Sequence, residues 1–148
     1  MSAPKIYVPC DASALPLGAH DDVAATRTYA HAPQIKLDII RNGTRGMLWL
    51  EPLVEVETPN GRMAYGAVTP DDVPSLFAAN FLNGGQHKLS QGLTDNIPYF
   101  ARQQRLTFAR CGLTNPLCLQ DYEAHGGLRG LRTALQSTPR FIVETVTE

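Results

Sequence analysis

Cysteine is scarce in this chain of 148 residues, which holds three, at Cys10, Cys111 and Cys118. An odd and widely spaced set of this kind cannot form a framework of disulfides, so we expect reduced thiols. Six residues separate Cys111 from Cys118, whereas only about two to four separate the cysteines of a zinc knuckle. The four histidines form no H-x3–5-H pair either. The sequence therefore predicts no metal site.

Long apolar runs and an excess of one charge are absent as well. No apolar run approaches the roughly 18 residues of a membrane-spanning helix, and the opening residues MSAPKIYVPCD are unlike a secretory signal. The formal net charge is -1 and the isoelectric point is ≈ 6.4, which gives no basic surface for nucleic acid or an anionic membrane. We expect a cytoplasmic protein without a nucleic-acid or membrane partner.

Motifs that bind phosphate or activate a nucleophile are missing too. The sequence contains no G-x-G-x-x-G, no G-x-x-x-x-G-K-[ST] and no G-x-S-x-G. Residues 42–46 (NGTRG) could form an anion-binding nest, although an ordinary turn is the favoured interpretation. Trp49, the sole tryptophan, is interpreted as a core or interface anchor. We therefore assign no catalytic, cofactor-binding or metal-binding residue to this chain.

Hydrophobic patterning predicts a small α/β domain in the first 80 residues or so. The tripeptide Pro59-Asn60-Gly61 predicts a tight hairpin, because Asn-Gly tolerates the positive φ angles of such a turn. Thr69-Pro70-Asp71-Asp72 predicts the start of a helix that runs to about Ala79. The order strand, helix, strand, hairpin, helix is that of a small thioredoxin-like domain. Its strands are expected at 5–9, 34–41, 53–58 and 62–66, and its first helix at 21–31.

The second half of the chain has a different character. Residues 81–98 are rich in glycine and polar residues and are interpreted as a connector over the surface. Residues 99–148 are expected to be mainly helical, with a short strand at 105–110. Helix starts are predicted after Asn115-Pro116 and Thr138-Pro139.

Residues 110–148 resemble the segment that opens the flavoprotein subunit of respiratory complex I and its relatives. The shared pattern is a proline at a helix start, a tyrosine, a Gly-Gly pair, a leucine-rich helix, and a Thr-Pro followed by spaced valines. In that family a glycine-rich FMN-binding loop follows at once, so we expect this chain to be the first part of a longer subunit. The matching residues are Pro116, Tyr122, Gly126, Gly127, Leu131, Ala134, Leu135, Pro139, Val143 and Val146.

Residues 41–66 and 65–73 (YGAVTPDDV) resemble the thioredoxin-like [2Fe-2S] ferredoxin domain of the same enzyme group. In that domain a C-x4-C pair follows the first strand and a second cysteine pair precedes the hairpin. Here Cys10 stands alone with Leu15 at the partner position, and residues 47–51 (MLWLE) fill the region of the second pair. Four thiolates hold such a cluster. The resemblance therefore implies an α/β, thioredoxin-like ferredoxin-type domain that lacks its [2Fe-2S] cluster, followed by a mainly helical extension.

A cluster-less domain of this kind ahead of a flavoprotein domain is similar to the beta (diaphorase) subunit of soluble NAD-dependent formate dehydrogenases that contain molybdenum or tungsten. The resemblance implies three parts: the cluster-less domain at 1–80, a linker at 81–98, and the truncated start of the FMN- and NAD-binding domain at 99–148. It implies a docking role in a complex that converts formate and NAD+ to CO2 and NADH. The expected partners are the large catalytic subunit and a small [2Fe-2S] subunit.

The cofactors of such a complex lie elsewhere in the assembly. FMN, NAD, a [4Fe-4S] cluster, [2Fe-2S] clusters and the molybdenum or tungsten pterin are expected in the full complex and none in this chain. The chain by itself is therefore expected not to be catalytic.

Three alternatives stay open. The diaphorase subunit of NAD-reducing hydrogenases is built alike. A free-standing module could use the Cys10 thiol in the manner of a peroxiredoxin, although Ser13 stands where a C-x-x-C partner would be and no resolving cysteine follows. A complete, stand-alone thioredoxin-like adaptor without catalytic activity is the third.

Overall fold

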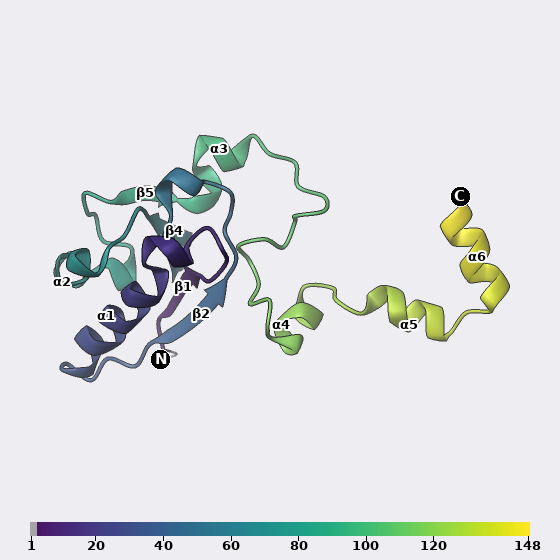
Figure 1. The fold of residues 1–148 in the computed structure, drawn as a ribbon, viewed down its shortest axis with the longest axis horizontal. Coiled ribbons are helices and arrows are strands. Elements are labelled where there is room, and N and C mark those ends of the chain that lie inside the picture. Colours follow the sequence, from purple (N-terminus) through teal and green to yellow (C-terminus); the bar gives the residue numbers. More distant parts are fainter. Residues whose placement is uncertain (1–2) are drawn as a thin grey trace.

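A five-stranded mixed sheet forms the centre of the molecule. The computed structural model describes residues 3–148 (Figure 1). The strand order is β2-β1-β3-β4-β5, in which β1 and β2 are parallel and every other neighbouring pair is antiparallel. The strands are β1 (Lys5–Pro9), β2 (Asp38–Asn42), β3 (Val54–Thr58), β4 (Gly61–Tyr65) and β5 (Ser90–Leu93).

One face of the sheet carries the main hydrophobic core. Because side chains alternate between the two faces of a strand, Ile6 and Val8 of β1 and Val54 and Val56 of β3 all point to this face and are buried. The helices α1 (Ala19–His31) and α2 (Val73–Ala78) cover it. Burial of such apolar area supplies roughly 25 cal/mol per Å² and is the main term that stabilises the domain.

One hairpin turn and one helix start that the sequence predicted are confirmed. Gly61 opens β4 at φ +117°, a conformation that glycine adopts without strain, and β3 and β4 pair as the predicted hairpin. Before α2, the Asp72 carboxylate accepts hydrogen bonds from the Thr69 backbone N–H at 3.2 Å and from its hydroxyl at 2.6 Å. These bonds fix the chain at the predicted helix start.

The predicted surface connector at residues 81–98 is wrong in its middle. Strand β5 lies in this stretch and pairs with β4, so it is the edge strand of the sheet. The sequence SQGL lacks the β-branched residues and clear alternation that mark a strand. Its pairing comes from the exposed edge of β4, which is a tertiary influence that local propensity does not report.

The strand predicted at 105–110 is also wrong. These residues form turns, and the side chains of Leu106 and Phe108 are 90% and 67% exposed. No neighbouring strand in the sheet pairs with this stretch, and an alternating pattern alone does not make a strand without a partner.

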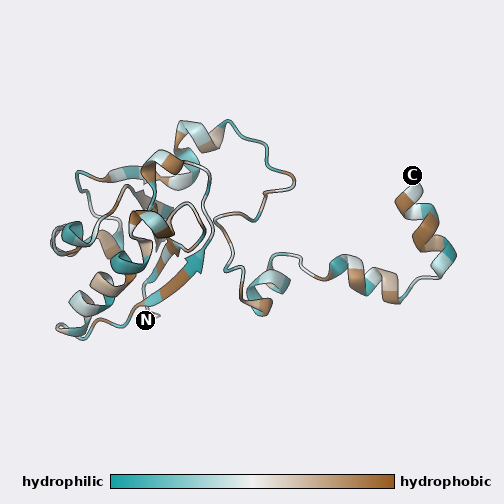
Figure 2. Ribbon diagram, viewed as in Figure 1, coloured by the Kyte–Doolittle hydropathy of each residue, from teal (hydrophilic) through white to brown (hydrophobic). Residues whose placement is uncertain are grey.

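The helix start predicted at Thr138-Pro139 is confirmed, whereas the helix predicted from Asn115-Pro116 begins at Leu119. These two helices and one between them make up the C-terminal extension. They are α4 (Leu119–Ala124), α5 (Arg129–Leu135) and α6 (Pro139–Thr147), and they run one after another away from the sheet domain (Figure 1). The Thr138 hydroxyl accepts a hydrogen bond from the Phe141 N–H at 3.3 Å and so caps α6. Each of these helices contains apolar residues (Figure 2), and the side chains of Leu135 and Val146 are about four-fifths exposed.

The fold class is thus confirmed as a mixed α/β domain followed by a helical extension. None of the helices between residues 3 and 148 is long and apolar enough to cross a membrane.

Candidate functional site

The carboxyl ends of β1 and β2 meet at one end of the sheet, because these two strands are parallel neighbours. The loop after β1 begins with Cys10, whose N–H donates to the carbonyl oxygen of Asn42 at the end of β2, at 2.9 Å. The structure therefore brings together the two segments in which a cluster-bearing relative would keep its cysteine pairs.

The Asp11 carboxylate bridges these two loops. It accepts a hydrogen bond from the Ser13 N–H at 2.9 Å within its own loop, and one from the Thr44 N–H at 2.5 Å in the loop after β2. Residues 42–46 were considered as a possible anion-binding nest. In the structure, the Asp11 carboxylate of the same chain is the anion that the Thr44 N–H binds. Burial raises the pKa of this carboxyl, but the hydrogen bonds from Ser13 and Thr44 outweigh burial and hold the pKa below its usual value.

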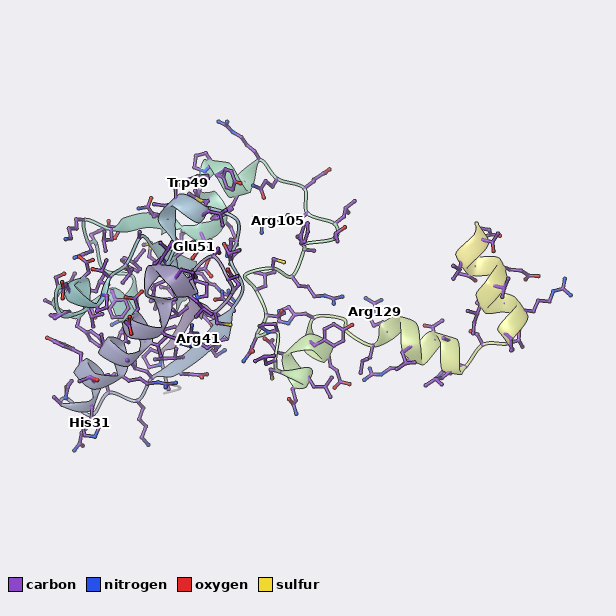
Figure 3. The ribbon with its side chains drawn as sticks, in the orientation of Figure 1. His31, Arg41, Trp49, Glu51, Arg105 and Arg129 are labelled. Carbon is purple, nitrogen blue, oxygen red and sulfur yellow. The ribbon has the colours of Figure 1, made fainter. Side chains whose placement is uncertain are left out.

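Thr44 continues the network to Glu51. The Thr44 hydroxyl donates to Oε1 of Glu51, and its oxygen accepts a hydrogen bond from the Gly46 N–H at 2.9 Å. The other carboxylate oxygen of Glu51 accepts from the Leu53 N–H at 2.9 Å. Glu51 is 3% exposed and lies inside the domain (Figure 3). Burial raises its pKa by more than the hydrogen bonds from Thr44 and Leu53 lower it.

These residues do not fit a [2Fe-2S] cluster. Such a cluster needs four ligands, usually thiolates, and Cys10 is the one cysteine in the two loops that follow β1 and β2. Residues 47–51, which occupy the region of the second cysteine pair, do not gather around Cys10. Met47 is 5% exposed and packs with Leu53 and Phe100 in a small core, whereas Trp49 is 64% exposed and lies edge-on to Tyr99 at a centroid distance of 5.1 Å.

A second buried network lies on the face of the sheet opposite α1. Glu55 of β3 is 1% exposed and pairs with two arginines. Arg45 Nε lies 2.6 Å from Glu55 Oε1, an ion pair by distance rather than a directed hydrogen bond, and Arg62 Nη1 donates to Oε2 at 3.1 Å. The Arg62 guanidinium also lies 3.4 Å from the centroid of the Tyr7 ring, within the range of cation–π attraction.

This network pins the chain where the C-terminal extension leaves the domain. Arg62 donates to the carbonyl oxygens of Gly112 at 2.8 Å and Leu113 at 3.0 Å, and the Asn42 amide also donates to Gly112 at 2.8 Å. Arg105 donates to the Arg45 carbonyl oxygen at 2.6 Å. We refer to residues 105–113 as the strap, since they are held across the sheet by these contacts.

A polar groove of about 790 Å³ opens beside the strap. Lys5, Tyr7 and Glu57 line it from the sheet, and Asp121 of α4 and His125 just after that helix line its other side. The Tyr7 hydroxyl donates to Glu57 at 3.0 Å, and Lys5 pairs with the same carboxylate at 3.3 Å. Burial raises the pKa of Tyr7 to about 12, although the neighbouring Arg62 opposes this shift. The Lys5, Tyr7 and Glu57 side chains in the groove are therefore already paired with one another.

The remaining candidates from the sequence are scattered. Cys10 is half-buried, Cys118 lies beside α4, and Cys111 is exposed on the strap, and all three are free thiols. Sequence reasoning did not single out Asp11, Glu51, Glu55 or Arg62 as site residues, and it considered Thr44 only as part of a possible anion-binding nest at residues 42–46. The one local signal was Asp11 two positions before Ser13, the spacing of an Asx turn.

Comparison with known proteins shows the fold. No family model and no curated protein matches the chain. The wild-type thioredoxin-like [2Fe-2S] ferredoxin from Aquifex aeolicus matches with a TM-score of 0.51 and 19% identity, over 62% of this chain and 99% of the ferredoxin. A serine variant of that ferredoxin matches with a TM-score of 0.51 and 20% identity, over 60% and 98% of the two chains.

The matched share is close to that of the segment from β1 to α3 (Pro98–Ala101). Between residues 3 and 148, no three histidine, cysteine, aspartate or glutamate side chains are grouped so that they could hold a metal ion. The chain therefore has the fold of a thioredoxin-like [2Fe-2S] ferredoxin. At the end of the sheet where the sequence comparison led us to look for cysteine ligands, it has two carboxylates and a threonine, Asp11, Glu51 and Thr44.

Proposed function

We propose that this chain is the N-terminal docking part of the flavoprotein (diaphorase) subunit of an NAD-dependent formate dehydrogenase that contains molybdenum or tungsten. The observation that carries the proposal is a ferredoxin fold whose cluster end is filled by Asp11, Thr44 and Glu51 instead of thiolates. A domain without cluster ligands has no centre that could relay electrons. Its function would therefore lie in the contacts that its surface makes with other proteins.

The exposed apolar residues support a docking role. Apolar side chains gathered on an unpartnered surface mark interaction sites in stable proteins. On α6, Ile142, Val143 and Val146 fall on one side of the helix, and the last two are 65% and 82% exposed. On the sheet domain, Leu48 and Trp49 are 54% and 64% exposed.

The chemistry of the complex belongs to other groups. Formate would be oxidised in the large catalytic subunit, and electrons would reach FMN through iron–sulfur clusters before hydride passes to NAD+. This chain's residues would hold the flavoprotein domain against the large subunit and a small [2Fe-2S] subunit. The resemblance of residues 110–148 to the segment that leads into an FMN-binding domain supports this placement.

The test is to tag the N-terminus of this chain in its native host and to purify what it holds. We expect the large formate dehydrogenase subunit and the small [2Fe-2S] subunit in the eluate, together with formate-dependent reduction of NAD+. Val146→Asp, which puts a charge on the apolar side of α6, should lower the yield of both partners. Glu144→Gln, which changes a charge on the opposite side of α6, is the control and should not.

Two alternative functions predict other outcomes of the same experiment. A diaphorase subunit of an NAD-reducing hydrogenase, which is built alike, would give NAD+ reduction that depends on hydrogen and not on formate. A stand-alone adaptor would bring down neither activity. Either result would contradict the formate dehydrogenase assignment.

A further inference from the structure

We propose that hydrogen bonds among Asp11, Thr44 and Glu51 replace a metal cluster as the fastener between the loops at this end of the sheet. The inference deepens the docking function proposed above and rests on it in one respect only: a docking surface must keep one shape. We refer to these three residues as the staple.

The staple connects three strands. Asp11 follows β1, Thr44 follows β2, and Glu51 precedes β3. The contacts run from the Asp11 carboxylate to the Thr44 N–H, from the Thr44 hydroxyl to Glu51, and from Glu51 to the Leu53 N–H. A cluster with two ligands from each loop would cross-link the same two segments. The staple makes that link with groups the chain already contains.

The partners of the staple are satisfied inside the protein. Glu51 is 3% exposed and uses one oxygen for Thr44 and the other for Leu53. Removal of the Thr44 hydroxyl would leave a buried carboxylate oxygen without its donor, which is costly in a medium that excludes water. Asp11 is charged at neutral pH, because hydrogen bonds hold its pKa low, and hydrogen bonds to a charged acceptor are the strong ones.

The staple also shapes the surface that we assign to docking. The hydrogen bond between Thr44 and Glu51 closes the loop that is formed by residues 45–50. Leu48 and Trp49 lie within that loop and are more than half exposed. Figure 3 shows Trp49 at the edge of the domain and Glu51 within it. A closed loop therefore holds these two apolar side chains outward without a metal.

Native-state hydrogen exchange on the full chain tests the staple directly. We expect the Thr44 amide to be protected in the wild-type chain and its exchange to speed up by at least about tenfold in Asp11→Asn and in Thr44→Val. Asp38→Asn, the same chemical change at an exposed residue of β2, is the matched control and should leave Thr44 exchange unchanged. Unchanged exchange in both staple variants would overturn the proposal.

A metal-binding measurement covers the opposite possibility. The chain is incubated anaerobically with ferrous iron, sulfide and a thiol reductant, then desalted. We expect no retained iron, no visible absorption band, and a melting temperature that a chelator does not change. Stoichiometric retention of iron would overturn the proposal.

The two proposals fail in different ways. If the staple variants behave as expected but the tagged wild-type chain brings down no formate dehydrogenase subunit, the docking function is wrong and the staple stands. If the wild-type chain brings down its partners but the exchange rate of the Thr44 amide is unchanged in the staple variants, the staple is wrong and the docking function stands.

Discussion

Arg62 on β4 donates a hydrogen bond to the carbonyl oxygen of Gly112 at 2.8 Å, across 50 positions of the chain. The same side chain pairs with buried Glu55 and covers the ring of Tyr7. One arginine thus connects the centre of the sheet to the strap from which the extension departs.

Gly112→Ala should loosen the strap. Gly112 has φ +78°, and a Cβ built there would lie 2.2 Å from Cγ of Arg45, so the added methyl group both strains the backbone and displaces a buried arginine. We expect a loss of about 1–3 kcal/mol in the free energy of unfolding. Urea denaturation measures this loss, and tryptic cleavage after Arg105 and Arg110 should become faster.

The control for that variant is Gly130→Ala. A Cβ at Gly130 in α5 would meet nothing within 4 Å, and its φ is not positive. Alanine should be neutral there or should stabilise the helix slightly. Equal effects of the two substitutions would mean that close contact at Gly112 does not matter.

Arg62→Met should destabilise the domain more than Arg62→Lys. Methionine leaves Glu55 with Arg45 as its remaining cation. It also leaves the Leu113 carbonyl oxygen without its Arg62 donor, and the Gly112 carbonyl oxygen with Asn42 as its remaining donor. We expect a cost of at least about 2 kcal/mol, because a buried charge loses part of its compensation. Lysine keeps the charge but cannot donate to two carbonyl oxygens with the fixed geometry of a guanidinium. Thermal and urea unfolding of both variants would show whether this ranking is correct.

Asp22→Asn should make the folded state more stable near and above pH 7 and not below a pH of about 4. Asp22 is 1% exposed, and neither carboxylate oxygen has a hydrogen-bond partner among residues 3–148. Burial, with smaller contributions from Asp21 and Asp72, raises its pKa from 3.8 to about 7, while Arg41 opposes the shift. The folded state therefore holds this proton more tightly than the unfolded state.

The sign of the pH dependence follows from that difference. Below a pH of about 4 the proton is bound in both states, so Asp22 adds no pH-dependent cost. Stability is lost as the pH rises from about 4 to about 7, by at most about 4 kcal/mol at one pKa unit per 1.4 kcal/mol. Melting temperatures between pH 4 and pH 8 should diverge for wild type and Asp22→Asn, with Asp38→Asn as the exposed control. A constant gap across this range would contradict the prediction.

Trp49 should report partner binding by its fluorescence. It is the sole tryptophan and is 64% exposed, so its emission in the free chain should be that of an indole in water. If the surface around Leu48 and Trp49 docks a partner, burial of the indole should shift the emission to shorter wavelengths on addition of the large or small subunit. A complex that forms without any shift would exclude Trp49 from the interface.

Much of the sheet domain could be predicted from short-range signals. Pro59-Asn60-Gly61 and Thr69-Pro70-Asp71-Asp72 each contain the residues that a specific backbone conformation requires, and the structure has the hairpin and the helix there. Strand β5 could not be predicted in this way, because SQGL becomes a strand only beside the open edge of β4.

The site was harder to predict than the fold. The missing cysteines indicated what the end of the sheet lacks, but nothing local indicated that Asp11 would reach Thr44, 33 positions away. Glu55 lies between two valines in an alternating strand, a pattern that is typical of a side chain facing solvent on a half-buried sheet. The strap and two arginines bury it instead, a consequence of contacts between distant segments.

The strap also fixes the point from which the extension reaches outward. Because Gly112 and Leu113 are tied to the sheet, anything bound by α4, α5 or α6 stays within a short chain length of β1 and β2. Two weak contacts joined in this way act as one, since the second forms at an effective concentration of about millimolar for a short tether. Severing the strap would therefore reduce avidity even if every contact residue remained intact.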